Sequence, residues 1–264
     1  MNTSEQFQRH LIEFQDRFMY LANRYDSTIH HSSELETIID DYSAFITDES
    51  NKKAWEQLEQ QASSEFSRLV ADLRKTSAQC VAIMEKYRAL KLLNGEVART
   101  DYFKNVESCI EKEFGSFQVT SDSTVLLIGS GSFPMTPLFI AKRTGAQVVG
   151  IDVDEEAIEL GRRVIARLGS GLNIRLENVF VEHLDVTKDV THIIFSSTVA
   201  NKYDLLDQLH PLTNEQVVVA MRYGDRLKSL FNYPMKETAE RKWRLIDMIL
   251  RPGHVFDIAL YEKA

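Results

Sequence analysis

The segment 124–154, TVLLIGSGSFPMTPLFIAKRTGAQVVGIDVD, decides the fold of this chain. It opens with 125–128, a short apolar run typical of a strand that is covered on both faces. The G-x-G of residues 129–131 follows, then a stretch with helical spacing, and then a second apolar run, 147–151, which leads to Asp152. This order of strand, glycines, helix, strand and acid predicts a nucleotide-binding βαβ unit, in which the acid accepts hydrogen bonds from ribose hydroxyls.

The loop departs from the dinucleotide fingerprint at the third glycine position, where Pro134 stands. Pro134 and Pro137 suit a first helical turn, but they widen the loop and leave few N–H groups to hold a pyrophosphate. The segment therefore favours a nucleoside cofactor without phosphates, of which S-adenosylmethionine is the commonest. A tight turn that binds no ligand is the alternative. An NAD-dependent dehydrogenase is disfavoured, because the packing glycine is missing.

The composition is that of a soluble globular protein: 264 residues, of which 44% are hydrophobic and 27% charged. This length allows two domains or one large one. A net charge of −8 argues against a sequence-independent nucleic-acid binder. No apolar run has the length of a membrane span, and the N-terminus has neither the basic start nor the apolar core of a signal peptide. We expect a cytoplasmic protein that contacts neither nucleic acid nor membrane.

The chain up to about residue 114 has the pattern of a helical bundle. It contains no proline and a single glycine, Gly95, and its apolar residues recur at helical spacing. Cys80 and Cys109 lie in helix-like contexts without a C-x-x-C pair, so we expect buried thiols and not a disulfide or a metal site. The expected helical runs are 7–21, 35–45, 55–62, 66–73, 80–90 (closing at 94–95) and 102–114.

From residue 115 on, runs typical of strands alternate with runs typical of helices. The expected strands are 125–128, 147–151, 173–177, 191–196, 217–221 and 254–261, and the expected helices are 136–144, 155–168, 203–210 and 236–249. This alternation predicts an α/β fold with a parallel, doubly wound sheet, whose ligand lies at the carboxyl ends of the strands. We therefore divide the chain into a helical domain, 1–116, and a Rossmann-like domain, 117–264.

Residues at the expected strand ends form the predicted cofactor site. They are Gly129, Ser130, Gly131, Phe133, Pro134, Asp152, Val153, Val179, Ser196 and Ser197. The two serines could instead cap a helix. Arg222 offers a guanidinium that can bind both oxygens of a carboxylate, with a surface ion pair as the alternative. Glu85 stands at the margin of an apolar helical face, where burial would raise its pKa and suit it to act as a base; a solvated helix glutamate is the alternative.

Several motifs resemble those of the nicotianamine synthase family. GSGSFPMT (129–136) is similar to that family's G-S-G-P-L-P-L-T, YFKNVE (102–107) to its Y-Y-N-N-Y segment, and 221–234 to its R-S-A-H-G-A-R-x-F-L-Y-P block. The stretches DDYSAFI, AMRYGD, FNYP and FDIALY are closer to the short bacterial members, the D-histidine 2-aminobutanoyltransferases of staphylococci that act in staphylopine-type metallophore synthesis. This similarity covers nearly the whole chain.

The resemblance implies a Rossmann-like domain of class I methyltransferase type, with the helical domain as a lid. It implies transfer of the 2-aminobutanoyl group of S-adenosylmethionine to the α-amine of D-histidine, with release of methylthioadenosine and without a metal. In this scheme Glu85 is the base, Tyr102 lies beside the amine, and Arg222 or Tyr233 holds a carboxylate or closes the pocket. The product would pass to an opine dehydrogenase, and a homodimer is the default assembly.

Two other functions fit the same residues. The first is an S-adenosylmethionine-dependent methyltransferase that acts on a small molecule, since it would share the fold and the glycine loop. The second is a nucleoside-binding regulator without catalytic activity.

Overall fold

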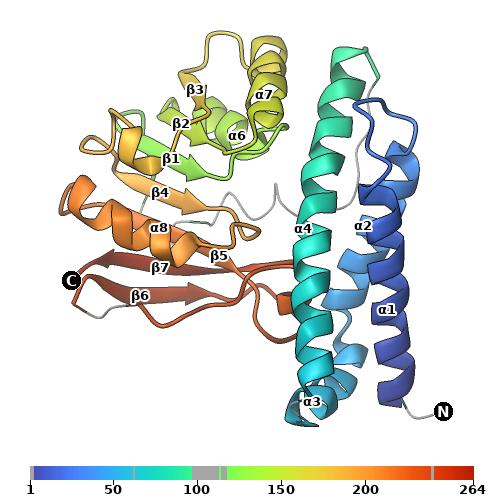
Figure 1. Cartoon of the computed structure of the whole chain (residues 1–264). Coiled ribbons are helices and arrows are strands. Elements are labelled where there is room, and N and C mark those ends of the chain that lie inside the picture. The colour runs from blue at the N-terminus through green and yellow to red at the C-terminus, as the bar shows by residue number, and fades with distance from the viewer. Residues whose placement is uncertain (1–2, 62, 97–112, 114–117, 239–240) are drawn as a thin grey trace.

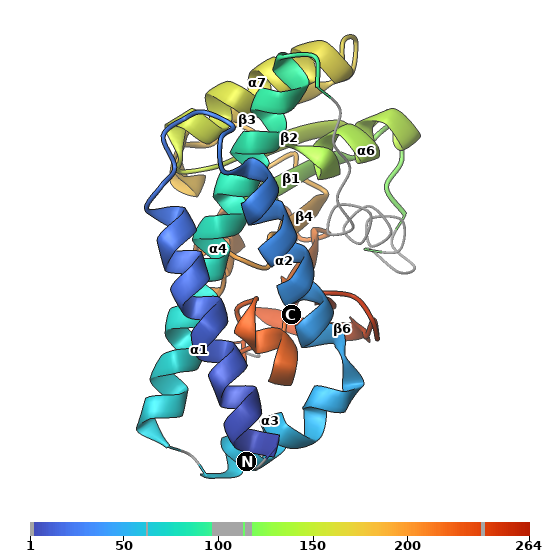
Figure 2. The ribbon, with the colours of Figure 1, turned by 90° about the vertical axis from the view of Figure 1, so that its right-hand side faces the viewer.

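The computed structural model of the chain describes residues 3–61, 63–96, 113, 118–238 and 241–264. Figure 1 shows a group of helices beside a seven-stranded sheet, with α4 standing between the sheet and the helices α1 and α2. In the view turned by 90° (Figure 2), α1, α2 and α4 lie in front of the strands. The helical first part of the chain therefore stands across the edge of the sheet toward which β1 and β4 point. The boundary predicted between residues 116 and 117 falls outside the described residues and stays a prediction.

Two of the helical runs expected from the sequence are one continuous helix in the structure. The runs expected over 66–73 and 80–90 form a single helix of 30 residues, α4, because the polar stretch between them contains neither glycine nor proline. Ser63 caps its start by accepting from the N–H of Phe66, and the predicted stop at Asn94 and Gly95 is confirmed, with Gly95 at φ +86°. The described elements are α1 (Thr3–Ala22), α2 (Ser32–Thr47), η1 (Glu49–Asn51), α3 (Lys52–Gln61) and α4 (Ser64–Leu93).

The sheet is mixed, with strand order β3-β2-β1-β4-β5-β7-β6. Its first five strands are parallel, as predicted, whereas β7 runs antiparallel to both β5 and β6. The strands are β1 (Thr124–Ile128), β2 (Gln147–Ile151), β3 (Ile174–Glu177), β4 (His192–Phe195), β5 (Val218–Tyr223), β6 (Trp243–Ile249) and β7 (Asp257–Lys263). The helices between them are α6 (Met135–Thr144), α7 (Glu155–Leu168), α8 (Lys202–Leu209) and the short η2 (Val181–His183), η3 (His210–Leu212) and η4 (Arg226–Leu230).

The prediction of a helix over 236–249 was wrong, because this segment contains the edge strand β6. Its apolar residues Leu245, Ile246, Met248 and Ile249 follow helical spacing. The segment nevertheless forms a strand, because the connection to β7 returns the chain as a hairpin in which Leu245 pairs with Tyr261. A register shift between Leu245 and Asp247 interrupts the alternation that would have indicated a strand.

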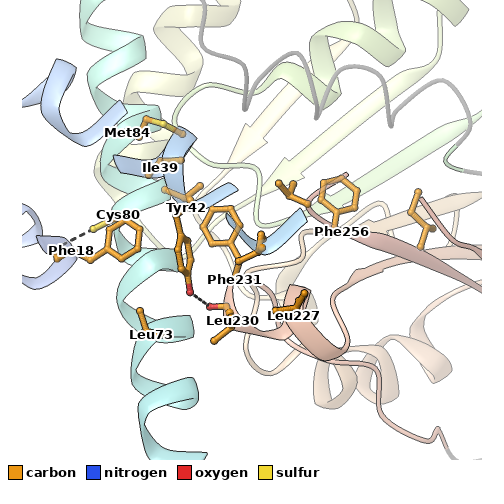
Figure 3. Close-up of a cluster of buried hydrophobic side chains, with 14 of the residues drawn as sticks. Phe18, Ile39, Tyr42, Leu73, Cys80, Met84, Leu227, Leu230, Phe231 and Phe256 are labelled. Carbon is orange, nitrogen blue, oxygen red and sulfur yellow. Dashed lines mark hydrogen bonds between the residues drawn. The ribbon is translucent and has the colours of Figure 1, made fainter. Parts of the chain in front are cut away.

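Helices cover both faces of the sheet, so the doubly wound arrangement is confirmed. Alternate residues of β1 divide between two cores: Val125 and Leu127 pack in the cluster that includes the helical part, while Leu126 and Ile128 pack in the cluster that includes α8. Figure 3 shows the first of these cores, where the hydroxyl of Tyr42 donates to the carbonyl of Leu230 at 2.9 Å. The helical part and the sheet therefore share one continuous core. In the part of the chain that the structure describes, no helix is long and apolar enough to cross a membrane.

Candidate active site

A cavity of about 380 Å³ opens where α4 passes the carboxyl ends of β1, β2 and β4. Strand order reverses between β1 and β4, and such a switch point is where open α/β sheets bind ligands. Two carboxylates, Glu85 and Asp152, are the charged groups among the lining residues that the structure describes. The sheet side contributes Ile128, Gly129, Gly131, Ile151, Asp152, Val153, Val179, Phe180, Ser196 and Thr198, and α4 contributes Ala78, Val81, Ala82 and Glu85.

The glycine loop after β1 needs its glycines for both backbone and packing reasons. Gly129 and Gly131 have φ of +82° and +64°, in the left-handed region that other residues rarely adopt. A Cβ on Gly129 would lie 2.8 Å from a methyl carbon of Val199, and a Cβ on Gly131 would lie 1.9 Å from Oε2 of Glu85. The loop is therefore closed from two sides by side chains that leave no room for a Cβ.

Asp152 holds the glycine loop in addition to facing the cavity. Its Oδ2 accepts from the N–H of Gly131 at 2.9 Å, and its Oδ1 accepts from the N–H of Asp154 at 3.1 Å. Burial raises the pKa of Asp152. A carboxylate has roughly four acceptor positions, so this side chain retains capacity for a ribose hydroxyl.

Glu85 reaches the same loop from the helical part of the chain. Burial, together with the negative charge of Asp152, raises the pKa of Glu85 to about 8, so the predicted upward shift is confirmed. The N–H of Ser132 donates to its carboxylate, and the charges of Arg88 and Arg222 favour its ionised form, but these are smaller effects. A pKa raised in this way suits a group that takes up a proton near neutral pH, and the role of Glu85 as the base stays a prediction.

A second, smaller cavity of about 50 Å³ adjoins the first. Glu85, Gly129 and Ser196 line both cavities, so the carboxylate of Glu85 stands at the boundary between them. The other residues of the small cavity are Leu127, Ser130, Phe133, Met135, Thr136, Ser197, Arg222 and Phe256.

Arg222 lines the small cavity but is already engaged by a carboxylate of the protein. Its Nε and Nη2 donate to Glu113 at 2.5 and 2.7 Å, and Nη2 also donates to the hydroxyl of Thr136 at 3.1 Å. The guanidinium lies 5.1 Å from the ring centroid of Phe256. The ion pair weighed as an alternative thus exists, although it is buried and not at the surface. Binding of a substrate carboxylate by Arg222 stays a prediction, since that group would have to share the guanidinium with Glu113.

No protein-family model matches the chain. Among proteins of known function, L-histidine 2-aminobutanoyltransferase of Pseudomonas aeruginosa is 28% identical over 232 residues, covering 86% of this chain and 85% of that protein. The L-histidine 2-aminobutanoyltransferase of Yersinia pestis is 31% identical over 196 residues, covering 73% of this chain and 72% of that protein. The chain belongs to the 2-aminobutanoyltransferase family.

Solved structures of the nicotianamine synthase MtNAS share the fold of this aminobutanoyltransferase. MtNAS in complex with MTA and tNA matches with a TM-score of 0.75 at 14% identity, covering 98% of each chain. A glutamate-to-glutamine variant of MtNAS in complex with S-adenosylmethionine matches with a TM-score of 0.70, covering 95% of this chain and 98% of that one. The expected combination of a helical N-terminal part and a Rossmann-like, doubly wound sheet is therefore confirmed. Membership of this family makes the chain an enzyme.

Most of the remaining predicted site residues line one of the two cavities, but a few do not. Tyr102 and Cys109 lie outside the described residues. Pro134 is buried at the start of α6 and lines neither cavity. Tyr233 also lines neither: the guanidinium of Arg74 lies 5.5 Å from its ring centroid. The other predicted cofactor residues line one of the two cavities or both. Their roles stay predictions.

One group at the site, Glu113, escaped the sequence reasoning, and Asn178 has a contact that its place after a strand did not indicate. Glu113, which is 109 positions from its partner Arg222, follows no motif that could have indicated it. Asn178 donates from its side-chain amide to the carbonyl of Asp152 at 2.9 Å and so fixes the end of β2, although only its place after a strand pointed to it. The described residues contain no group of three or more His, Cys, Asp or Glu that could hold a metal ion.

Proposed function

We propose that this enzyme transfers the 2-aminobutanoyl group of S-adenosylmethionine to the α-amine of histidine and releases methylthioadenosine. Membership of the 2-aminobutanoyltransferase family supports the class of reaction. The observation that carries the assignment of the site is the meeting of Glu85 with the glycine loop at the boundary of the two cavities.

The cavity of about 380 Å³, called here the large cavity, has a lining that suits a nucleoside carrying a sulfonium. No Lys or Arg side chain stands among the lining residues that the structure describes, so a pyrophosphate would find no counter-charge there. The carboxylates of Glu85 and Asp152 would instead attract a cation. Asp152 would accept from the ribose, and the apolar side chains of Val153, Val179 and Phe180 would flank the adenine.

The small cavity is the place we assign to the acceptor. A sulfonium carries three carbon substituents, and the one that lies in line with the nucleophile at about 3–3.5 Å is transferred. Glu85 takes a proton from the acceptor ammonium, and the amine then forms a C–N bond with the Cγ of the aminobutanoyl group. The C–S bond breaks, its electron pair stays on sulfur, and neutral methylthioadenosine leaves. The same carboxylate borders both cavities, so deprotonation occurs beside the carbon that is attacked.

The enantiomer of the acceptor is the finer part of the proposal. The resemblance to the staphylococcal members predicts D-histidine, whereas the relatives in Pseudomonas aeruginosa and Yersinia pestis are named for L-histidine. We propose D-histidine for this chain.

The experiment that tests the proposal is an analysis of the released nucleoside. Purified protein is incubated with S-adenosylmethionine and D-histidine, L-histidine or no acceptor. We expect methylthioadenosine with D-histidine. S-adenosylhomocysteine in its place would support the methyltransferase alternative, and binding of S-adenosylmethionine without turnover would support the regulator. Faster turnover with L-histidine would leave the class of reaction intact but overturn the proposed enantiomer.

Three further proposals concern the setting of the reaction. The product retains the primary amine of the aminobutanoyl group, which suits reductive joining to a keto acid by an opine dehydrogenase. A homodimer is the default assembly of such an enzyme. A cytoplasmic location is supported by Cys80, a buried free thiol whose Sγ contacts the carbonyl of Phe18.

A further inference from the structure

We propose that Lys86 is a positioning residue for the transfer: its ammonium clamps the helix that carries Glu85 to the loop that carries Asp152. This inference rests on the proposed function, since it concerns the geometry of the same site. Lys86 lines neither cavity and matches no motif that the sequence analysis singled out.

The contacts of Lys86 join two distant parts of the chain. Its Nζ lies 2.7 Å from Oδ2 of Asp154 and 2.6 Å from Oε2 of Glu156, two carboxylates 68 and 70 positions further along the chain. The Lys86 side chain is 10% exposed, whereas each of its partners is 39% exposed. The ammonium is therefore held at the inner side of two carboxylates that belong to the start of α7.

The start of α7 is tied directly to the predicted ribose acid. Asp154 caps the helix by accepting from the N–H of Ala157 at 3.2 Å, and its own N–H donates to Asp152 at 3.1 Å. Lys86 thus holds a loop whose backbone is hydrogen-bonded to the side chain of Asp152. Because Lys86 follows Glu85 directly on α4, the clamp acts within one residue of the predicted base.

Tyr25, from a third segment of the chain, contacts both Glu156 and Lys86. The hydroxyl of Tyr25, in the connection between α1 and α2, donates to Oε1 of Glu156 at 2.7 Å. The ammonium of Lys86 lies 5.4 Å from the ring centroid of Tyr25, within the range of a cation–π contact. The cluster of Tyr25, Lys86, Asp154 and Glu156, called here the α4–α7 clamp, therefore draws on three separate segments.

The need for a clamp follows from the charges at the glycine loop. Asp152 accepts from the N–H of Gly131, and Glu85 reaches the same glycine from the other side. When Glu85 loses its proton, two carboxylates face the loop from two parts of the chain and repel each other. The ammonium of Lys86 offsets this repulsion, because it attracts Asp154 and Glu156, which lie at the start of α7 beside Asp152. The clamp thereby keeps Glu85 beside the donor in its ionised, active state.

Lys91 provides a matched control on the same helix. Its side chain is 9% exposed and its Nζ contacts both carboxylate oxygens of Glu36 at 3.0 and 2.9 Å. That pair joins α4 to α2, inside the helical part, and does not reach the sheet. Lys86→Met and Lys91→Met therefore each remove a buried ammonium from α4, but only the first breaks the link between Glu85 and the donor loop.

The test compares these variants in binding of S-adenosylmethionine by calorimetry, in kcat and KM, and in Tm. We expect Lys86→Met to weaken donor binding and to lower kcat by about 10–100-fold, since small displacements of reacting groups have effects of that size. KM for histidine should change little. Lys91→Met should keep both donor affinity and kcat within about twofold, although it lowers Tm like any broken buried pair. Lys86→Arg should restore most of the activity.

Two outcomes would overturn the clamp, and neither depends on the nature of the transferred group. Equal donor affinities and equal kcat values for Lys86→Met and Lys91→Met would reduce Lys86 to a structural ion pair. If Lys86→Met fails to fold, the double variant Asp154→Asn/Glu156→Gln replaces it, because asparagine keeps the helix cap while both charges that hold Lys86 are removed. Unchanged kcat and donor affinity in that variant would likewise overturn the proposal. If wild-type protein transfers no aminobutanoyl group, the proposed function fails, and calorimetric donor binding alone still tests the clamp.

Discussion

Oε2 of Glu85 occupies the space that a Cβ on Gly131 would need, at a distance of 1.9 Å from that position. The contact joins the helical part of the chain to the glycine loop of the sheet. The donor loop and the predicted base are therefore brought together by the fold itself. Gly131 lines the large cavity, and Glu85 lines both, so the contact lies where the two substrates would meet.

Gly131→Ala should abolish most donor binding and turnover. Its φ of +64° disfavours alanine, and the added methyl group would displace the Glu85 carboxylate. Gly145→Ala is the matched control, because Gly145 has φ +77° but its nearest neighbour would lie 3.6 Å from the new Cβ. Both variants should lose stability, measured as Tm, and only Gly131→Ala should lose donor affinity. Equal affinities would contradict the contact.

Glu85→Gln should bind S-adenosylmethionine much as the wild type does but turn over about 10²–10⁴-fold more slowly, the usual effect of removing a general base. Glutamine keeps the size of the side chain and the contact with the loop. Calorimetry measures the first quantity, and release of methylthioadenosine measures the second. Unchanged turnover would exclude Glu85 as the base.

The stability of the protein should depend on pH through Glu85. The folded state holds this proton up to about pH 8, whereas an ordinary glutamate loses it near pH 4.5. Between these values the unfolded chain has fewer protons bound, so the free energy of unfolding contributed by Glu85 falls as pH rises. The Tm of Glu85→Gln relative to wild type should therefore increase across this interval and level off above it. A difference that is independent of pH would show that the pKa of Glu85 is not raised.

Asp152→Ala should weaken binding of S-adenosylmethionine by about 1–3 kcal/mol, as loss of a charged hydrogen-bond acceptor does. The variant also removes the acceptor of the Gly131 N–H, so Asp152→Asn is the informative comparison. Asparagine retains one acceptor oxygen and should lose less affinity. If calorimetry shows the same affinity for Asp152→Ala as for wild type, the ribose is held elsewhere.

Lys202→Met should lower the free energy of unfolding by about 2–4 kcal/mol, because two buried carbonyls lose their donor. Lys202 has no exposed surface, and its Nζ donates to the carbonyls of Arg222 and Tyr233 at 2.7 and 2.8 Å. Lys242→Met removes an exposed pair with Asp207 and should cost less than about 1 kcal/mol. Urea denaturation measures both. Similar values for the two variants would contradict the role of Lys202 in fixing the end of β5.

The features that followed from the sequence are local ones. Gly129 and Gly131 were predictable because a tight turn after a buried strand restricts φ at those positions. The five parallel strands were predictable because short runs, mostly apolar or, in β3, alternating between apolar and charged residues, recur along this half of the chain. The edge strand β6 was not, since its apolar residues follow helical spacing and only its pairing with β7 makes it a strand.

Contacts between distant segments could not be predicted from a single sequence. Glu113 meets Arg222 across 109 positions, and Lys86 meets Glu156 across 70. Glu113, Lys86 and Glu156 resemble ordinary surface charges in the sequence, because their contacts depend on how distant segments pack on the sheet. Glu85 was identified by its place beside an apolar helical face and by a family resemblance. Its contact with Gly131 becomes evident only in the folded chain.

In the proposed reaction, the fold turns the aminobutanoyl carbon of S-adenosylmethionine, and not its methyl carbon, toward the amine. The most direct test uses S-adenosylmethionine labelled with carbon-13 either in the methyl group or in the aminobutanoyl chain, with D-histidine as acceptor and mass spectrometry of both products. The account predicts that the chain label appears in the histidine product, while the methyl label leaves with methylthioadenosine. Methyl label in the histidine product would contradict it.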